Sequence, residues 1–224
     1  MDQTGGAKIA EGSFGCVFIP KLKCSTTSKE QVLTKNTEIA HTKVIDKLIV
    51  ASEAEFEFSI AKMIHTLPLW KQYFIVADSM CTPAPIQNQT DPAIKDCAVI
   101  DPHHLEALKL LRMSYGGVSL KSYRMNFNRY SFLDFIKHLL EGAAILTIYG
   151  IIHFDLHPGN ILVDSVNIPR IIDFNLSVYI KKPFNKDSIR LSTYMPQLMQ
   201  ISPDDSIVKA TWKYGDGQRG INDI

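Results

Sequence analysis

The 224-residue sequence lacks long hydrophobic runs, CxxC cysteine pairs, low-complexity segments and a strong excess of charge of either sign. The longest candidate membrane stretch, residues 142–152, is about half of the ~20 residues that a spanning helix needs. The first residues contain no apolar signal core. A net charge of +1 gives no reason to expect nucleic acid or an anionic membrane as a partner. We therefore expect a soluble protein, with no prediction of its oligomeric state.

The four cysteines, at positions 16, 24, 81 and 97, show no metal-binding or disulfide-framework spacing. They are interpreted as reduced thiols, which predicts a cytoplasmic protein. Apolar residues make up 46% and charged residues 21% of the chain, as in ordinary globular proteins. This length can form one large domain or two small lobes with a substantial core.

Apolar periodicity predicts an α+β fold with a strand-rich first part and a helix-led second part. Strands are expected in 7–20 (with a glycine turn), 39–45, 73–77, 105–113, 161–164 and 169–174. Helices are expected over 53–67 and 131–149. The segment 78–104, rich in proline and polar residues, is predicted to be a long loop with some structure of its own. The glycine pair after Met113 predicts a boundary between two lobes near residues 113–118.

Two features of the first part suggest anion binding. The glycines of Gly12-Ser-Phe-Gly15 allow backbone N–H groups to approach phosphate oxygens, although an ordinary hairpin explains them equally well. Lys43 lies within the apolar segment IAHTKVI and needs an anionic partner if it points inward. Glu57, near the inward face of the following helix, is the preferred partner, and Glu55 is the alternative.

The segment HFDLHPGN, residues 153–160, follows a buried-looking apolar run. Alternating His153, Asp155 and His157 could bind zinc, but such a site needs a further ligand. The amide of Asn160 and the carboxylate of Asp173, within strand-like IIDF, instead suit a hard cation such as Mg²⁺ bound to phosphates. Asp155 could accept the proton of an attacking hydroxyl.

In this order EGSFGCV, IAHTKVI, HFDLHPGN and IIDFN resemble the motifs of the protein-kinase superfamily, over roughly residues 9–177. The overall pattern is similar to divergent serine/threonine-type kinases of large DNA viruses, which would place the protein in the host cytoplasm or the virion. The resemblance implies a bilobal fold: an antiparallel-sheet lobe at 1–113, a hinge at 114–118, and a mainly helical lobe at 119–224. Because only 51 residues follow Asp173, the second lobe is expected to be shortened.

The resemblance also implies roles for individual residues. Asp155 would be the catalytic base, Lys43 would hold the phosphates of ATP and pair with Glu57, and Asn160 and Asp173 would bind Mg²⁺. His153 would have a structural role. The residues expected around ATP are Ala10, Gly12, Ser13, Phe14, Gly15, Val17, Lys43, Glu57, Met113, Ser114 and Gly116.

Three departures from the family pattern affect the expected function. Ala10 replaces the first loop glycine, Asn175 replaces the glycine of the DFG motif, and His157 stands where many serine/threonine kinases carry lysine. Asparagine tolerates the positive φ expected at position 175. The expected activity is transfer of the γ-phosphate of ATP to a hydroxyl, preferably a protein serine or threonine. A small-molecule kinase, favoured by LHPGN, and a catalytically impaired kinase-like scaffold remain the alternatives.

Overall fold

The computed structural model describes residues 7–12, 15–19, 21–26, 29–33, 43–89, 94–95, 97, 102–124 and 131–180. The chain divides into two compact units, Met1–Thr66 with Ile75–Tyr115, and Leu67–Phe74 with Gly116–Ile224. The division after Tyr115 falls within the predicted hinge, whereas residues 67–74, predicted for the first lobe, belong to the second unit. The predictions for Ser13, Phe14, residues 39–42 and the segment after Ile180 lie outside the described residues.

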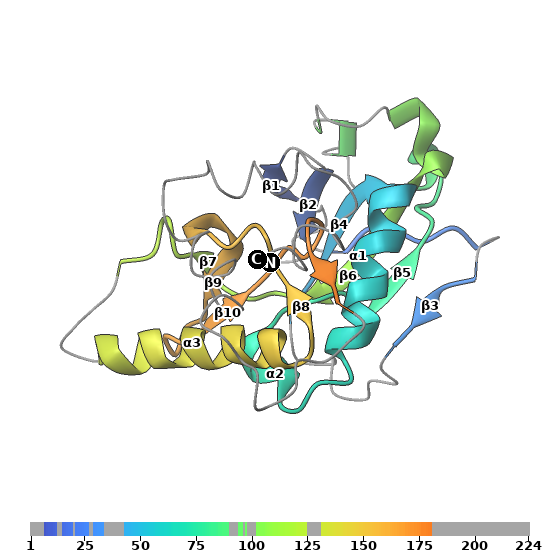
Figure 1. Ribbon diagram of the computed structural model, residues 1–224. Coiled ribbons are helices and arrows are strands. Elements are labelled where there is room, and N and C mark those ends of the chain that lie inside the picture. Colours follow the sequence, from blue (N-terminus) through green and yellow to red (C-terminus); the bar gives the residue numbers. More distant parts are fainter. Residues whose placement is uncertain are drawn as a thin grey trace, which may run out of the picture. The chain divides into compact units, whose positions relative to one another are not determined.

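The first unit contains a six-stranded sheet in the order β1–β2–β4–β6–β5–β3, in which all neighbours are antiparallel (Figure 1). Its strands are β1 Ala7–Gly12, β2 Gly15–Ile19, β3 Gln31–Val32, β4 Val44–Val50, β5 Ser79–Cys81 and β6 Leu108–Ser114. The predicted hairpin is present as β1 and β2. The strand predicted for 39–45 is displaced along the chain to β4, and the predicted loop 78–104 contains β5 and a 3₁₀ turn, Ile86–Asn88.

The register gives the sheet two faces, because residues directly opposite each other in antiparallel strands point to the same side. Cys16 of β2 faces Leu48 of β4, which faces Leu110 of β6, which faces Cys81 of β5. These four residues lie in one buried apolar cluster, which the segment before β6 also joins. We call this side of the sheet the disulfide face.

Both disulfides belong to this face. Cys16 is bonded to Cys97, and Cys24 to Cys81, with Cα–Cα distances of 6.0 Å and 5.9 Å, so no cysteine of the chain is free. The prediction of reduced thiols is therefore wrong, and the cytoplasmic location loses that support. The pairs are 81 and 57 residues apart in sequence, so spacing alone did not reveal them.

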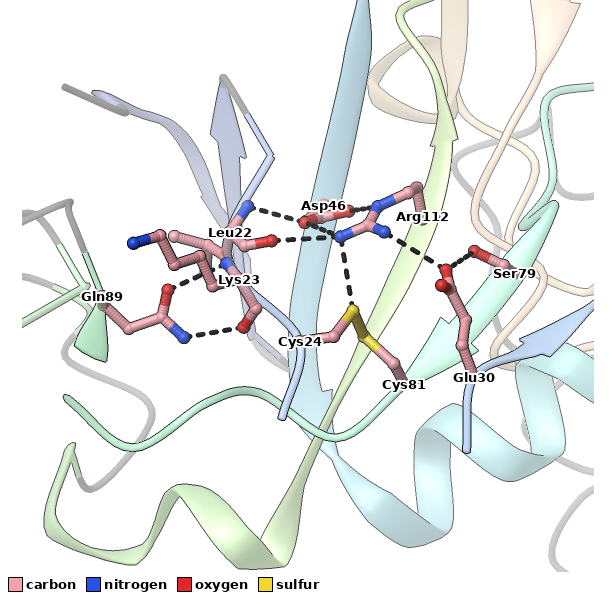
Figure 2. A network of polar contacts seen from close by, with 9 residues as sticks. All are labelled: Leu22, Lys23, Cys24, Glu30, Asp46, Ser79, Cys81, Gln89 and Arg112. Atoms are coloured by element: carbon pink, nitrogen blue, oxygen red, sulfur yellow. Dashed lines mark hydrogen bonds and ion pairs between the residues drawn. A yellow bond between two sulfur atoms is a disulfide. The ribbon is translucent and has the colours of Figure 1, made fainter. Parts of the chain in front are cut away.

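A buried ion pair lies on the same face, where Asp46 of β4 stands opposite Arg112 of β6 (Figure 2). Arg112 Nε and Nη2 donate to the two oxygens of Asp46 at 2.9 Å and 3.1 Å. The same carboxylate accepts the Leu22 N–H at 2.7 Å, and Arg112 Nη2 donates to the Leu22 carbonyl at 3.0 Å. The pair thus fixes the chain that follows β2 to the centre of the sheet.

The other side of the sheet carries the helix α1, Ala51–Ile64, and we call it the helix face. The helix follows β4 without a loop and begins at Ala51, two residues before the predicted start at position 53. Its buried residues, Ala54, Glu57, Phe58, Ile60, Ala61 and Ile64, repeat at helical spacing. Packing of this stripe against β4 and β6 holds α1 in place (Figure 1).

The second unit is organised around the long helix α3, Phe132–Ile148, which agrees with the prediction of a helix over 131–149. The Ser131 side chain accepts the Asp134 N–H at 3.3 Å and caps its first turn. The described residues of this unit also form the short helix α2, a 3₁₀ turn at Pro158–Asn160 and five short strands: α2 Trp70–Tyr73, β7 Val118–Ser119, β8 Ile151–Ile152, β9 Ile161–Val163, β10 Pro169–Ile171 and β11 Val178–Tyr179.

Residues 73–77 do not form the predicted strand. Tyr73 ends α2, and only Phe74 makes a bridge, to Ile171. Tyr73 instead packs on α3, where its ring stacks on His138 with the centroids 4.6 Å apart. None of the helices in the described ranges combines the length and apolar character needed to cross a bilayer.

Candidate active site

The HFDLHPGN segment connects β8 to β9, and the IIDFN segment connects β10 to β11. Because β8 pairs with β11 and β9 with β10, the two connections leave neighbouring strand ends. The Ile172 N–H donates to the Asn160 carbonyl at 3.0 Å and continues the β9–β10 ladder into both loops. The two motifs that the sequence singled out therefore lie together in the second unit.

His153 is a fully buried, neutral link between these loops. Its Nε2 is 2.9 Å from the Ile172 carbonyl, and its Nδ1 accepts the Asp155 N–H at 3.2 Å. Burial lowers the pKa of His153 to about 4. Its ring lies 4.7 Å from that of Phe174. This environment agrees with the structural role expected for His153.

Both ring nitrogens of His153 are thus occupied, which leaves no atom for a metal ion. Among the residues that the structure describes, the one converging group of three potential ligands is Glu11, Cys16 and Cys97. Two of these are the disulfide sulfurs. The zinc interpretation of His153, Asp155 and His157 is therefore wrong.

Asp155 and Asn160 form a directly bonded pair. Asn160 Nδ2 donates to the Asp155 carbonyl at 2.9 Å and to its Oδ2 at 2.8 Å. Partial burial raises the pKa of Asp155, while the nearby His157 and the Asn160 hydrogen bond act in the opposite direction. Both hydrogen bonds use the nitrogen of the Asn160 amide, so its oxygen is the atom oriented away from Asp155. That oxygen is the kind of ligand that a hard cation takes.

Asp173 follows β10 in a left-handed conformation, with φ of 65°. The positive φ predicted for Asn175 thus occurs two residues earlier, at Asp173. Asn175 is buried, and its amide nitrogen and oxygen have no hydrogen-bond partner in the described part of the chain. Asp173 raises the pKa of Asp155, which places the two carboxylates within electrostatic reach.

In the first unit the strand lysine is Lys47, not Lys43. Lys47 Nζ lies 2.8 Å from Glu57 Oε2, and these side chains are only 12% and 7% exposed. Lys43 is exposed, precedes β4, and its Nζ lies 5.9 Å from the centre of the Tyr115 ring. The preference for Glu57 over Glu55 is consistent with the fold, because Glu57 is buried and Glu55 exposed. The predicted lysine was therefore wrong by four residues along the chain, whereas the predicted acidic residue, Glu57, is the one in the ion pair.

Two of the residues expected around ATP share the helix face with Lys47. Val17 of β2 lies directly opposite Lys47, and Met113 of β6 lies opposite Ile45. Met113 is buried, and Ser114 ends β6. Gly116 is the first residue of the second unit. These positions remain predictions as nucleotide contacts.

The glycine segment has a structural explanation as well. Gly12 pairs with Gly15 at the end of the hairpin, and Ala10 pairs with Val17. A Cβ atom at Gly15 would lie 2.1 Å from the Leu48 carbonyl oxygen. Close contact of β2 with β4 therefore requires glycine at position 15, whether or not a phosphate binds nearby.

Comparison with known proteins agrees with this arrangement. The family described as "Protein tyrosine and serine/threonine kinase" matches residues 4–197. The serine/threonine-protein kinase oca2 of Schizosaccharomyces pombe is 34% identical over 73 residues, 33% of this chain and 11% of that protein. A probable cell division protein kinase of Encephalitozoon cuniculi is 28% identical over 116 residues, 50% of this chain and 43% of that protein.

The matched region thus spans less than half the length of either relative. The family match covers most of the present chain and includes each motif described above. The antiparallel sheet with the helix α1 and the linked HFDLHPGN and IIDFN loops agree with the arrangement that the resemblance implied, although the lysine that pairs with Glu57 is Lys47 and not Lys43. The chain belongs to the protein tyrosine and serine/threonine kinase family.

Proposed function

We propose that this chain transfers the γ-phosphate of ATP to a hydroxyl group, preferably of a serine or threonine in a protein. The observation that carries the proposal is the Asp155–Asn160 pair, held at 2.8 Å beside the loop of Asp173. The acceptor oxygen would attack the γ-phosphorus as the bond to the β–γ bridging oxygen breaks. ADP would leave with that oxygen, and Asp155 would take the hydroxyl proton.

The donor set of the second unit fits Mg²⁺. Asn160 offers an amide oxygen and Asp173 a carboxylate, both hard ligands. The bound ion would neutralise charge on the phosphates. Asp155, whose pKa is raised, would remain separate from these ligands as the proton acceptor.

The first unit would supply the remaining charge. Lys47 replaces Lys43 as the proposed phosphate ligand, because Glu57 holds its ammonium group in a defined position. Val17 and Met113 would contact the adenine from the same face of the sheet. Gly12 and Gly15 would allow the hairpin backbone to approach the phosphates, with Ser114 and Gly116 at the hinge.

A radiolabelled-ATP assay with mixed protein and small-molecule acceptors tests the proposal. We expect labelled protein, and loss of transfer in Asp155→Asn with nearly unchanged ATP affinity. Lys47→Met should abolish transfer, whereas Lys43→Met, the matched control, should retain it. Labelling of small molecules alone would favour the small-molecule kinase.

Thermal unfolding with ATP and Mg²⁺ supplies the second measurement, because a ligand that binds only the folded state raises its stability. Stabilisation without transfer to any acceptor would favour the kinase-like scaffold. Absence of both stabilisation and transfer would refute the proposed function.

A further inference from the structure

His157, two residues after the proposed base, has a defined hydrogen-bonding state. The Gly159 N–H donates to His157 Nδ1 at 2.9 Å. A ring nitrogen that accepts a hydrogen bond carries no proton, so the proton of the neutral imidazole is on Nε2. Nε2 is the atom that faces Asp155, at 3.7 Å from Oδ2. The loop thus presents a donor to the carboxylate.

Gly159 provides the space that this ring occupies. A Cβ atom at position 159 would lie 2.5 Å from His157 Cε1 and 2.8 Å from Nδ1. The φ angle of Gly159 is not positive, in contrast to those of Gly117 and Gly150. Glycine at position 159 therefore leaves the space in which the imidazole lies, and a side chain there would displace the ring.

The two oxygens of Asp155 have different surroundings. Oδ2 accepts from Asn160 Nδ2 at 2.8 Å and faces His157 Nε2. Within the described ranges, Oδ1 makes no hydrogen bond. A separation of 3.7 Å is longer than a hydrogen bond, and such contacts in catalytic sites often shorten when the substrate is bound.

We propose that neutral His157 is a positioning residue for Asp155: its Nε2–H holds Oδ2 together with Asn160, so that Oδ1 receives the proton of the acceptor hydroxyl. This inference rests on the proposed phosphate transfer. It assigns His157 a role through hydrogen bonding, in place of the positive charge that a lysine would carry there. Glycine at position 159 leaves room for the imidazole in this position.

Two substitutions at position 157 distinguish the role of Nδ1 as an acceptor from the role of Nε2 as a donor. His157→Asn keeps an oxygen near the position of Nδ1, which can accept the Gly159 N–H, but has no donor that reaches Asp155. His157→Gln keeps a nitrogen donor near the position of Nε2 but loses the acceptor. We expect kcat to fall about 10- to 100-fold in His157→Asn, by analogy with other outer-shell orienting residues. We expect His157→Gln to retain most of the activity, and the KM for ATP and the Tm to change little in both.

Gly159→Ala tests the same geometry from the other side. The added methyl group should displace the ring and lower kcat about as much as His157→Asn does. In the double variant His157→Asn/Gly159→Ala, the alanine should lower kcat little further, because the ring that it would displace is already absent. Additive losses in the double variant would refute the link between Gly159 and His157.

The tautomer can be measured without activity. Long-range ¹H–¹⁵N NMR of the full chain labelled at its histidines, with His157→Asn for assignment, should show the His157 proton on Nε2. A proton on Nδ1 would overturn the inference, as would an active enzyme in which His157→Asn is at least as fast as His157→Gln. Wild-type protein without phosphate transfer would instead refute the proposed function itself, and the role of His157 with it.

Discussion

The Asp46–Arg112 pair should be costly to break, although it adds little net stability while intact. Asp46 is fully buried, and desolvation raises its pKa in spite of the two hydrogen bonds from Arg112. The carboxylate charge is therefore tolerated in the sheet mainly because Arg112 compensates for it. Arg112→Met would leave a buried charge without its partner, a change that typically costs about 3–5 kcal/mol. We expect a loss of this size in the first unit.

A second arginine–aspartate pair provides the matched control. Arg170 Nη1 lies 2.8 Å from Asp164 Oδ2, as close as the pair in the sheet, but these side chains are 22% and 21% exposed. Asp164 Oδ1 would keep the N–H groups of Val166 and Ile168 if Arg170 were removed. Arg170→Met should therefore cost about 1 kcal/mol or less.

Hydrogen exchange measures the two effects separately, since amides of β4 and β6 report on the first unit and amides of β9 and β10 on the second. The pH dependence gives an additional test. Because the folded pKa of Asp46 is raised, the folded state binds more protons than the unfolded state, and stability falls as the pH rises through that pKa. Without Arg112 the pKa rises further, so the loss in Arg112→Met should be smaller at pH 5 than at pH 8. Equal losses in the two arginine variants, or a loss independent of pH, would refute this reasoning.

Three further predictions concern other parts of the fold. Replacing Cys16 and Cys97 together by alanine should destabilise the first unit by about 4 kcal/mol, from the entropy of an 81-residue loop, as thermal unfolding of both proteins would show. Gly15→Ala should destabilise the protein by about 1–3 kcal/mol, because the added Cβ would contact the Leu48 carbonyl. Gly142→Ala in α3, where the nearest atom would lie 3.4 Å from the added Cβ, should stabilise it by about 0.5–1 kcal/mol. Denaturant titrations measure both changes. The pKa of His153 in the folded state is lowered to about 4, so the unfolded state binds the proton at a higher pH. The free energy of unfolding should therefore decrease by about 3 kcal/mol as the pH falls from 6.5 to 4. This pH dependence should be lost in His153→Gln.

Local sequence signals predicted the main helix and two strands of the second unit. The apolar repeat predicted α3, and the strands predicted at 161–164 and 169–174 are present as β9 and β10. The HFDLHPGN and IIDFN loops were recognised because each motif combines specific residue types at a fixed spacing within a few positions of sequence. Their side-chain bonds, such as Asn160 to Asp155, join residues five positions apart. Short-range contacts of this kind are readable from a single sequence.

Long-range pairings in the first unit could not be read in this way. Each disulfide joins segments at least 57 residues apart, and no spacing rule connects them. The Asp46–Arg112 pair spans 66 residues, and each of its members appears as an ordinary charged residue on a strand. Such contacts depend on the order of strands in the sheet, which the sequence pattern does not specify.

The choice between Lys43 and Lys47 shows the same limit in one strand. Both positions have the same parity, so alternation places both on the same face of an extended segment. Four residues of strand span about 13 Å, however, which exceeds the reach of a lysine side chain. Because α1 begins directly after β4, only the lysine nearer the helix can meet Glu57. The strand was predicted at 39–45, whereas β4 is Val44–Val50, so Lys47 lay outside the predicted strand and Lys43 was chosen.

The Asp46–Arg112 pair also bears on the register between β4 and β6. Asp46 and Lys47 are neighbours on β4 and point to opposite faces, Asp46 to Arg112 and Lys47 to Glu57. A slip of one residue between β4 and β6 would exchange the two faces, and would bury Lys47 on the disulfide face without an acidic partner. Apolar residues flank both positions and would tolerate that slip, whereas the Asp46–Arg112 contact forbids it. The contact is thus compatible with the register in which Lys47 lies on the helix face.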